Sequence, residues 1–189
     1  IFNTGLPSNL KVRWTNPSSG VRGSTEALLE TTGPILFEDS TSYALTATPS
    51  EIVVADLDGD NDPDVAMAVP DEGGGAGNVV ILINDGMSGN TWQVNELTPI
   101  PVGTNPIDIA VIDIDGDGVA NDLVVANYDS TSVTVLTNDG SASFTETEIT
   151  TDSSPRYLAI ANYVTTDGNG RDDIIIACDS FKISILENT

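Results

Sequence analysis

The stretch DLDGDNDPD, residues 56–64, places aspartates at alternate positions, with one glycine and one proline among them. Carboxylates this dense repel one another unless a cation lies between them. Aspartate also favours turns over helices and strands. Oxygen ligands at alternate positions of a tight loop are typical of calcium sites, because calcium takes about six to eight oxygens. The stretch therefore predicts a calcium loop, and a solvated acidic turn is the alternative reading of a single isolated copy.

The acidic stretch is repeated along the chain. Residues 113–118 read DIDGDG, and residues 167–173 read DGNGRDD, a more altered copy. Each copy follows a proline and an apolar strand, and the three prolines are Pro49, Pro106 and Pro155. Their spacings are 106 − 49 = 57 and 155 − 106 = 49 residues. These spacings are near the length of one β-propeller blade.

Within each repeat the expected order is strand, acidic loop, strand, polar turn and third strand. Asp-Gly turns are expected at 84–86 and 138–140, and more polar fourth strands at 91–97 and 144–149. The inner strands are almost entirely apolar, as in strands buried on both faces. We therefore predict an all-β fold of three propeller-like blades, each of four antiparallel strands, with calcium-loop hairpins.

The first and last strands of the pattern suggest a permuted repeat. Residues 35–45 precede Pro49 as a fourth strand precedes Pro106, whereas the third unit lacks a fourth strand of its own. The expected domains are a basic N-terminal arm or linker (1–34) and a repeat domain (35–189). The units of the repeat domain are about 49–105, 106–154 and 155–189, with strand 35–45 completing one of them.

Candidate metal ligands follow from the positions within each loop. Side-chain oxygens are expected from the first, third, fifth and ninth positions, and a backbone carbonyl from the seventh. In the first loop these residues are Asp56, Asp58, Asp60, Asp64 and, through its carbonyl, Asp62. In the second loop they are Asp113, Asp115, Asp117, Asp122 and, at the seventh position, Val119. The second loop is one residue longer, and Asp122 closes it because it leads into a strand as Asp64 does.

The third loop departs furthest from the pattern. Its candidate ligands are Asp167, Asn169, Asp173 and, at the seventh position, Arg171, with Asn162 as a further candidate for the first ligand. Arg171 brings a positive charge into the loop. We therefore expect calcium at two sites and treat a third as an open alternative. An EF-hand does not fit, because helices should flank it, and the glycine-rich short period of calcium-binding β-helices is absent.

Two longer segments carry a family resemblance. DLDGDNDPDVAMA and DIDGDGVANDLVVAN each follow an apolar strand and precede NVVILINDG or SVTVLTNDG. They resemble FG-GAP/VCBS repeats, the calcium-loop propeller blades of integrin-α-like domains and of many secreted bacterial proteins. The resemblance covers about residues 35–189. It implies a propeller with calcium on one rim and roles in adhesion or surface assembly. The longer second loop, the altered third loop and the count of three units depart from the family pattern.

The amino-acid composition argues against several classes of function. The net charge of −23 argues against nucleic-acid binding. Lys11, Arg13 and Arg22 give residues 1–25 a charge of +3, so the remaining chain carries −23 − 3 = −26. The chain has no histidine, and its one cysteine, Cys178, lies in an apolar run where we expect it to be buried. No nucleophile–base pair is visible, so we expect no enzyme. No apolar run approaches the roughly 20 residues of a membrane span.

Three assembly hypotheses remain open, because closed propellers have about four to eight blades. The chain forms part of a longer propeller, or it forms a compact three-sheet β domain in which 35–45 pairs with 182–188. Alternatively, residues 35–45 complete the third unit of a neighbouring molecule by strand addition, giving a head-to-tail fibre or ring. In that case the basic arm docks on the acidic body.

Two functions from different classes follow. The first is a non-catalytic, calcium-stabilised structural or adhesion module, secreted or at the cell surface, that self-associates or binds a protein partner through edge strands. A filament subunit is one form of it. The second is a carbohydrate-binding propeller in which Trp14, Trp92 or Tyr128 stacks on a glycan. The aromatic residues do not recur at one repeat position, so the first function is preferred.

Overall fold

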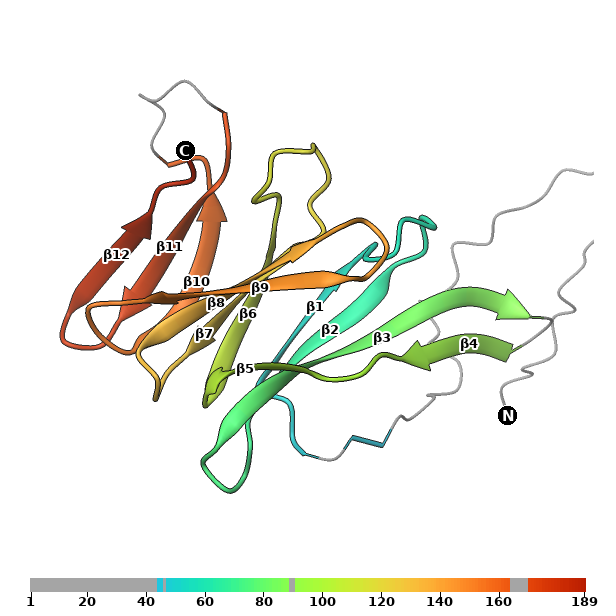
Figure 1. The fold of residues 1–189 in the computed structure, drawn as a ribbon, viewed down its shortest axis with the longest axis horizontal. Helices are drawn as coiled ribbons and strands as arrows, with labels where there is room; N and C mark the ends of the chain where they lie inside the picture. Colours follow the sequence, from blue (N-terminus) through green and yellow to red (C-terminus); the bar gives the residue numbers. More distant parts are fainter. Residues whose placement is uncertain (1–43, 46, 89–90, 164–169) are drawn as a thin grey trace, which may run out of the picture. The chain divides into compact units, whose positions relative to one another are not determined.

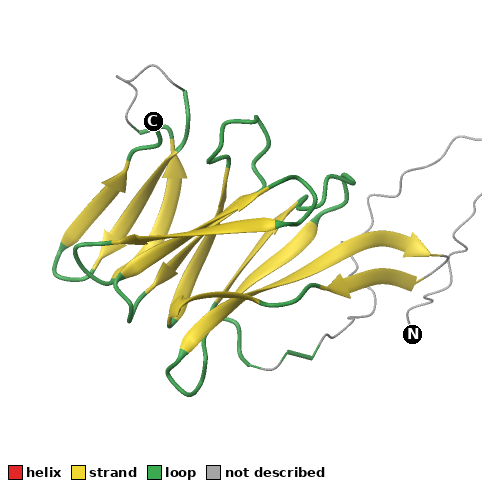
Figure 2. Cartoon of the chain, viewed as in Figure 1, coloured by secondary structure: helices red, strands yellow, loops and turns green. Residues whose placement is uncertain are grey.

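The computed structural model describes residues 44–45, 47–88, 91–163 and 170–189. The chain divides into two units, Ile1–Ala44 and Leu45–Thr189, and every described strand belongs to the second unit. The described residues form strands and loops without a helix (Figure 2). None of them forms a helix that is long and apolar enough to cross a bilayer. The strand predicted at 35–45 lies almost wholly outside the described residues.

The first sheet contains five antiparallel strands. β1 (Glu51–Ala55), β2 (Asp64–Val69), β3 (Ala76–Ser88) and β4 (Thr91–Glu96) are neighbours in chain order (Figure 1). β3 is long enough to take two partners on one edge. β4 pairs with its second half, from Leu82 onward, and β5 (Ile100–Thr104) pairs with its first half, from Ala76 to Val79. We call this assembly sheet 1.

The other two sheets repeat the same order. Sheet 2 contains β6 (Pro106–Ile112), β7 (Asp122–Asn127), β8 (Ser132–Asn138) and β9 (Phe144–Thr150). Sheet 3 contains β10 (Pro155–Ala161), β11 (Asp173–Cys178) and β12 (Lys182–Leu186). All neighbouring pairs are antiparallel. In every sheet, the acidic loop joins the first strand to the second.

The sheets pack face to face in chain order within the Leu45–Thr189 unit. One apolar core joins sheets 1 and 2 and includes Ala68, Val79, Ile109 and Leu123. A second core joins sheets 2 and 3 and includes Val124, Val133, Ile174 and Ile176. We call the face of a sheet that meets the following sheet its downstream face, and the opposite face its upstream face.

Burial explains the two strand compositions. β7 reads DLVVAN and is buried at every position, because sheet 2 lies between two other sheets. β9 reads FTETEIT and is mostly exposed, as expected of a polar edge strand. Cys178 is buried and free, as predicted.

The all-β prediction is confirmed, with three antiparallel sheets in the described residues. These sheets do not close on themselves, so they form an open stack of propeller-like blades rather than a ring. Two local predictions were wrong. β5 adds a fifth strand to sheet 1, because the unused edge of β3 offers ladder hydrogen bonds. The predicted turn at 84–86 lies within β3 and forms a bulge, because Gly86 adopts a φ of 73°.

Candidate metal centres

The first acidic loop connects β1 to β2 and is shaped by its own carboxylates. Asp56 accepts hydrogen bonds from the backbone N–H groups of Gly59 (2.8 Å) and Asn61 (2.9 Å). Asp58 accepts one from the N–H of Asp60 at 3.2 Å. Gly59 has a φ of 85°, and a Cβ there would lie 3.0 Å from the Gly140 carbonyl oxygen, so this position needs glycine.

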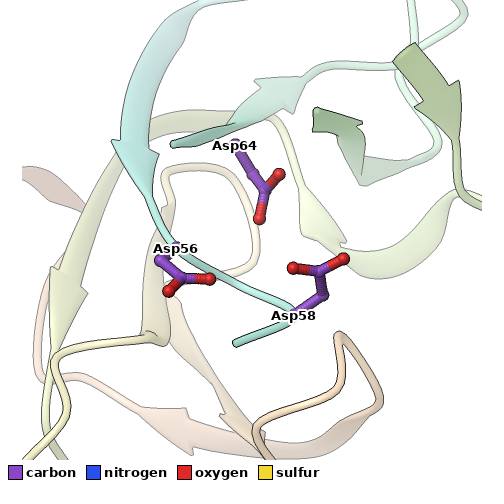
Figure 3. A group of neighbouring side chains, drawn as sticks. All are labelled: Asp56, Asp58 and Asp64. Carbon is purple, nitrogen blue, oxygen red and sulfur yellow. The ribbon is translucent and has the colours of Figure 1, made fainter. Parts of the chain in front are cut away.

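Three of the loop's carboxylates converge on one space. Asp56, Asp58 and Asp64 each offer an oxygen, and these oxygens lie within 4.8 Å of one another. Figure 3 shows the three carboxyl groups around this shared space. Asp64 reaches it from the first residue of β2, whereas Asp56 and Asp58 reach it from the loop. We call this group triad 1.

The second loop builds the same arrangement with one more residue. Asp113, Asp115 and Asp122 offer oxygens within 4.8 Å of one another, and we call them triad 2. Asp113 accepts from the N–H groups of Gly116 (2.7 Å) and Gly118 (2.9 Å), as Asp56 does in the first loop. The structure therefore places Asp122, rather than Asn121, beside the first and third positions.

The fifth-position aspartates lie outside both triads. Asp60 accepts from the N–H of Asp62 at 2.7 Å, and Asp117 accepts from the N–H of Val119 at 2.8 Å. Both aspartates are exposed. At the seventh positions, the Val119 carbonyl accepts a hydrogen bond from the N–H of Asn121 at 3.0 Å. The Asp62 side chain lies beside Gly86, at the bulge in β3.

The closing aspartates also hold each sheet together. Asp64 is fully buried and accepts from the N–H of Leu57 (2.7 Å) and the N–H of Asn84 (2.8 Å). These bonds tie the start of the loop and the bulge of the third strand to the start of the second strand. Asp122 repeats both bonds, with Ile114 and Asn138 as donors at 2.7 Å each. Each closing carboxylate therefore has a structural role that does not depend on a metal.

The third loop keeps this closing aspartate. Asp173 accepts from the N–H of Tyr163 (2.9 Å) and the N–H of Asn188 (3.0 Å). This bonding makes Tyr163 equivalent to Leu57 and places Asn162 where Asp56 stands in the first loop. The predicted ligands Asp167 and Asn169 lie outside the described residues. The guanidinium group of Arg171 lies against Gly116, so this cation reaches from the third loop to the second.

Sequence reasoning missed the role of an asparagine that recurs after the apolar run of each third strand, at positions 84, 138 and 188. Asn138 is buried, and its amide donates to the carbonyl oxygens of Leu57 (2.8 Å) and Asn121 (3.3 Å). Leu57 belongs to the acidic loop of the preceding sheet, so the first of these bonds links sheets 1 and 2. Asn188 makes the equivalent bond from sheet 3 to the Ile114 carbonyl of sheet 2, at 3.1 Å. The signal was present in the sequence as the similar endings ILIN, VLTN and ILEN of the three segments.

A second link joins sheets 2 and 3 away from the acidic loops. Tyr128 donates its hydroxyl hydrogen to Asp179 at 2.7 Å, and Arg156 pairs with the same carboxylate. The Arg156 guanidinium also lies 4.8 Å from the centre of the Tyr128 ring. The Arg156 hydrogen bond holds the pKa of Asp179 below its ordinary value, and the bond from Tyr128 adds to this effect.

The charge of the triads favours a hard cation. Desolvation, together with the charges of Asp60, Asp64 and Asp56, raises the pKa of Asp58. Burial likewise raises the pKa of Asp122, against the opposing effect of its backbone hydrogen bonds, chiefly those from Asn138 and Ile114. Three carboxylates with no thiolate or imidazole among them form a donor set that suits calcium or magnesium and not zinc. The residues of both triads therefore fit a calcium ion.

The stacked sheets and their acidic loops define a β-rich repeat protein. Residues 56–121, which span both triad loops except for Asp122, match the family described as FG-GAP-like repeat. The chain therefore carries an FG-GAP-like repeat, and the resemblance found in the sequence is confirmed. No curated protein matches the chain.

Proposed function

We propose that this chain is a calcium-stabilised, non-catalytic structural or adhesion module that works outside the cell. The observation that supports this most directly is the presence of two carboxylate triads at equivalent positions of two repeats. A charge cluster that recurs with the fold's period serves the repeat rather than a single catalytic centre. FG-GAP-like repeats are also typical of extracellular, non-enzymatic proteins, which supports the location and the class.

Calcium would act on the loops through charge. Each triad concentrates three carboxylates near the end of a sheet, in a chain with a net charge of −23. A divalent cation between them removes their repulsion and fixes the hairpin formed by the first two strands. Extracellular calcium modules bind with dissociation constants of about 10⁻⁴ to 10⁻³ M. Calcium outside the cell is about millimolar, so its concentration reaches these dissociation constants and would fill such sites.

Of the three aromatic candidates for glycan stacking, only Tyr128 has a described side chain, and it gives the carbohydrate-binding alternative no support. Arg156 lies over the Tyr128 ring, whose hydroxyl is bonded to Asp179, so Tyr128 serves the contact between sheets. Trp14 and the side chain of Trp92 lie outside the described residues. A structural role for the calcium loops is therefore the better-supported function.

Calorimetric titration of calcium into the metal-free chain tests this proposal. We expect binding at triads 1 and 2 and a rise in Tm on adding calcium that EDTA reverses. The double variant Asp58→Asn/Asp115→Asn should lose both heats of binding. Asp152→Asn removes one charge from an exposed turn outside the loops and serves as the control. A chain whose Tm is the same in calcium and in EDTA would contradict the proposal.

A further inference from the structure

The downstream face of sheet 3 is apolar and exposed. Tyr157 on β10 is 68% exposed, and Ile183 and Ile185 on β12 are 73% and 38% exposed. Ala159 and Ala177 are exposed on the same face, between these residues. The outer edge of β12 also has no strand beside it among the described residues. An exposed apolar sheet face of this kind marks an interaction surface.

The other two sheets show what covers this face. The closing aspartates align the strands, so Ile183 of sheet 3 corresponds to Val133 of sheet 2 and to Val79 of sheet 1. Val133 and Val79 are fully buried, because the upstream face of the following sheet packs on each of them. By analogy, the surface expected to pack on the downstream face of sheet 3 is the upstream face of another sheet of this kind.

Sheet 1 carries an upstream face with a matching exposed strand. Ile52 and Val54 on β1 are 53% and 59% exposed. The residue at the position of Ile52 in sheet 2 is Ile109, which is buried in the core between sheets 1 and 2. Leu45 already packs on the upstream face of sheet 1. It stands before Pro49 at the same spacing as Val102 before Pro106, and Val102 belongs to the core between sheets 1 and 2.

The hydrogen bonds between sheets follow one pattern, and its donor in sheet 1 and its acceptor in sheet 3 lie at opposite ends of the stack. In both existing contacts, the side-chain amide of the recurring asparagine (Asn138 or Asn188) donates to a loop carbonyl of the preceding sheet. The corresponding asparagine of sheet 1 is Asn84, which donates to Pro63 of its own loop at 3.1 Å. Its other amide hydrogen has no partner among the described residues. The residue of sheet 3 that corresponds to Leu57 and Ile114 is Tyr163, which is 61% exposed.

We propose that a second copy of this chain lays the upstream face of its sheet 1 on the downstream face of sheet 3, head to tail. The contact repeats the two sheet–sheet contacts already present, with Ile52 and Val54 of the second copy against Tyr157 and Ile183 of the first. Asn84 of the second copy donates to the Tyr163 carbonyl. The contact uses no residue of either carboxylate triad. It is therefore separate from the metal sites and goes beyond the calcium-dependent function.

The number of sheets leads to a definite expectation for the assembly. Two copies joined at both ends bring six described sheets together, and closed propellers form with about four to eight. We therefore expect a discrete closed dimer. A series of oligomers larger than the dimer would support the same contact in an open filament, because a head-to-tail contact that does not close into a ring propagates.

Sedimentation velocity over a range of concentrations tests the contact on the full chain in calcium buffer. Ile183→Lys places a charge on the sheet 3 face, and Val54→Lys places one on the sheet 1 face. Each should weaken self-association by about 100-fold or more, because an unpaired charge enters an apolar contact. An equimolar mixture of the two variants should form a one-to-one dimer, because each retains one intact face. Ile52→Lys replaces Val54→Lys if the latter does not fold.

Thr145→Lys, on the exposed edge strand β9, adds the same charge outside both faces and should leave self-association unchanged. Circular dichroism confirms that each variant is folded. Three results would overturn the proposal. These are a wild-type chain that stays monomeric at the highest concentration, folded variants whose mixture stays monomeric, and a dimer that survives both single substitutions.

Discussion

The same aspartate-to-asparagine change should have different effects at Asp58 and Asp64, although both belong to triad 1. Asp64 is buried and accepts hydrogen bonds from two backbone N–H groups, those of Leu57 and Asn84. Asp58 accepts a single longer bond, from Asp60, within the exposed part of the loop. Asp64 therefore serves the fold with or without calcium, whereas the proposed role of Asp58 is chiefly to hold the metal.

The magnitudes follow from these contacts. An asparagine at position 64 retains one acceptor oxygen, so one buried N–H group loses its partner, at a cost of about 1–3 kcal/mol. For a unit of this size, 1 kcal/mol shifts Tm by about 2–4 °C. Asp64→Asn should therefore lower the Tm of the metal-free chain by about 2–12 °C. Asp58→Asn should change the metal-free stability by less than about 0.5 kcal/mol, as surface substitutions do.

Calcium separates Asp58→Asn from the wild type, although the two have similar stability without metal. With calcium at about a hundred times the dissociation constant, a filled site stabilises the fold by about 2.7 kcal/mol. Asp58→Asn should lose this gain at the first site while keeping its metal-free Tm. The assay is thermal unfolding by circular dichroism, in EDTA and in saturating calcium, for the wild type and both variants. Asp152→Asn again serves as the control for charge.

Two results would refute this reasoning. If Asp58→Asn lowers the metal-free Tm as much as Asp64→Asn does, the two carboxylates have the same role and the hydrogen bonds at Asp64 carry no special weight. If Asp64→Asn leaves the metal-free Tm unchanged, the bonds to Leu57 and Asn84 do not hold the sheet together.

Two further predictions concern the contacts between sheets. Asn138→Ala removes the donor to the Leu57 carbonyl and should lower the free energy of unfolding in urea by about 1–3 kcal/mol; Asn84→Ala, whose amide reaches only its own loop, should cost less. Arg156 holds the pKa of Asp179 below its ordinary value of 3.8, so this pair contributes stability above about pH 4 that is lost as the pH falls through the folded-state pKa. Asp179→Asn should therefore flatten the acid side of the stability profile, measured by urea unfolding between about pH 2 and 5; an unchanged profile would contradict this assignment.

Much of the fold could be predicted because local patterns and tertiary contacts agree. The apolar strand β7 lies between two sheets, and the polar strand β9 lies at an edge, as their compositions indicated. The role of Asp122 as the closing residue followed from its place before a strand. Each of these features is determined by residues adjacent in the chain, so the local sequence is enough to predict it.

The missed features depend on partners that are far away in the sequence. β5 exists because the first half of β3 has a free edge, which the sequence of residues 100–104 does not reveal. The sequence predicts a turn at Asn138, whereas the partner of its side chain, the Leu57 carbonyl, is 81 positions away. Backbone carbonyls carry no sequence signal, so this kind of contact becomes visible only in the folded chain.

The position of Leu57 has a consequence for how the two ion sites respond to each other. Its neighbours in the chain, Asp56 and Asp58, belong to triad 1, and its carbonyl accepts from Asn138 and from the N–H of Ala142 at 2.8 Å, both in sheet 2. Asn138 in turn donates its N–H to Asp122 of triad 2. Two residues, Leu57 and Asn138, thus connect triad 1 to triad 2. A cation that fixes the first loop would hold Leu57, and through Asn138 also Asp122, in place for a second cation. Filling the first site should therefore raise the affinity of the second, and by thermodynamic reciprocity the second should raise that of the first.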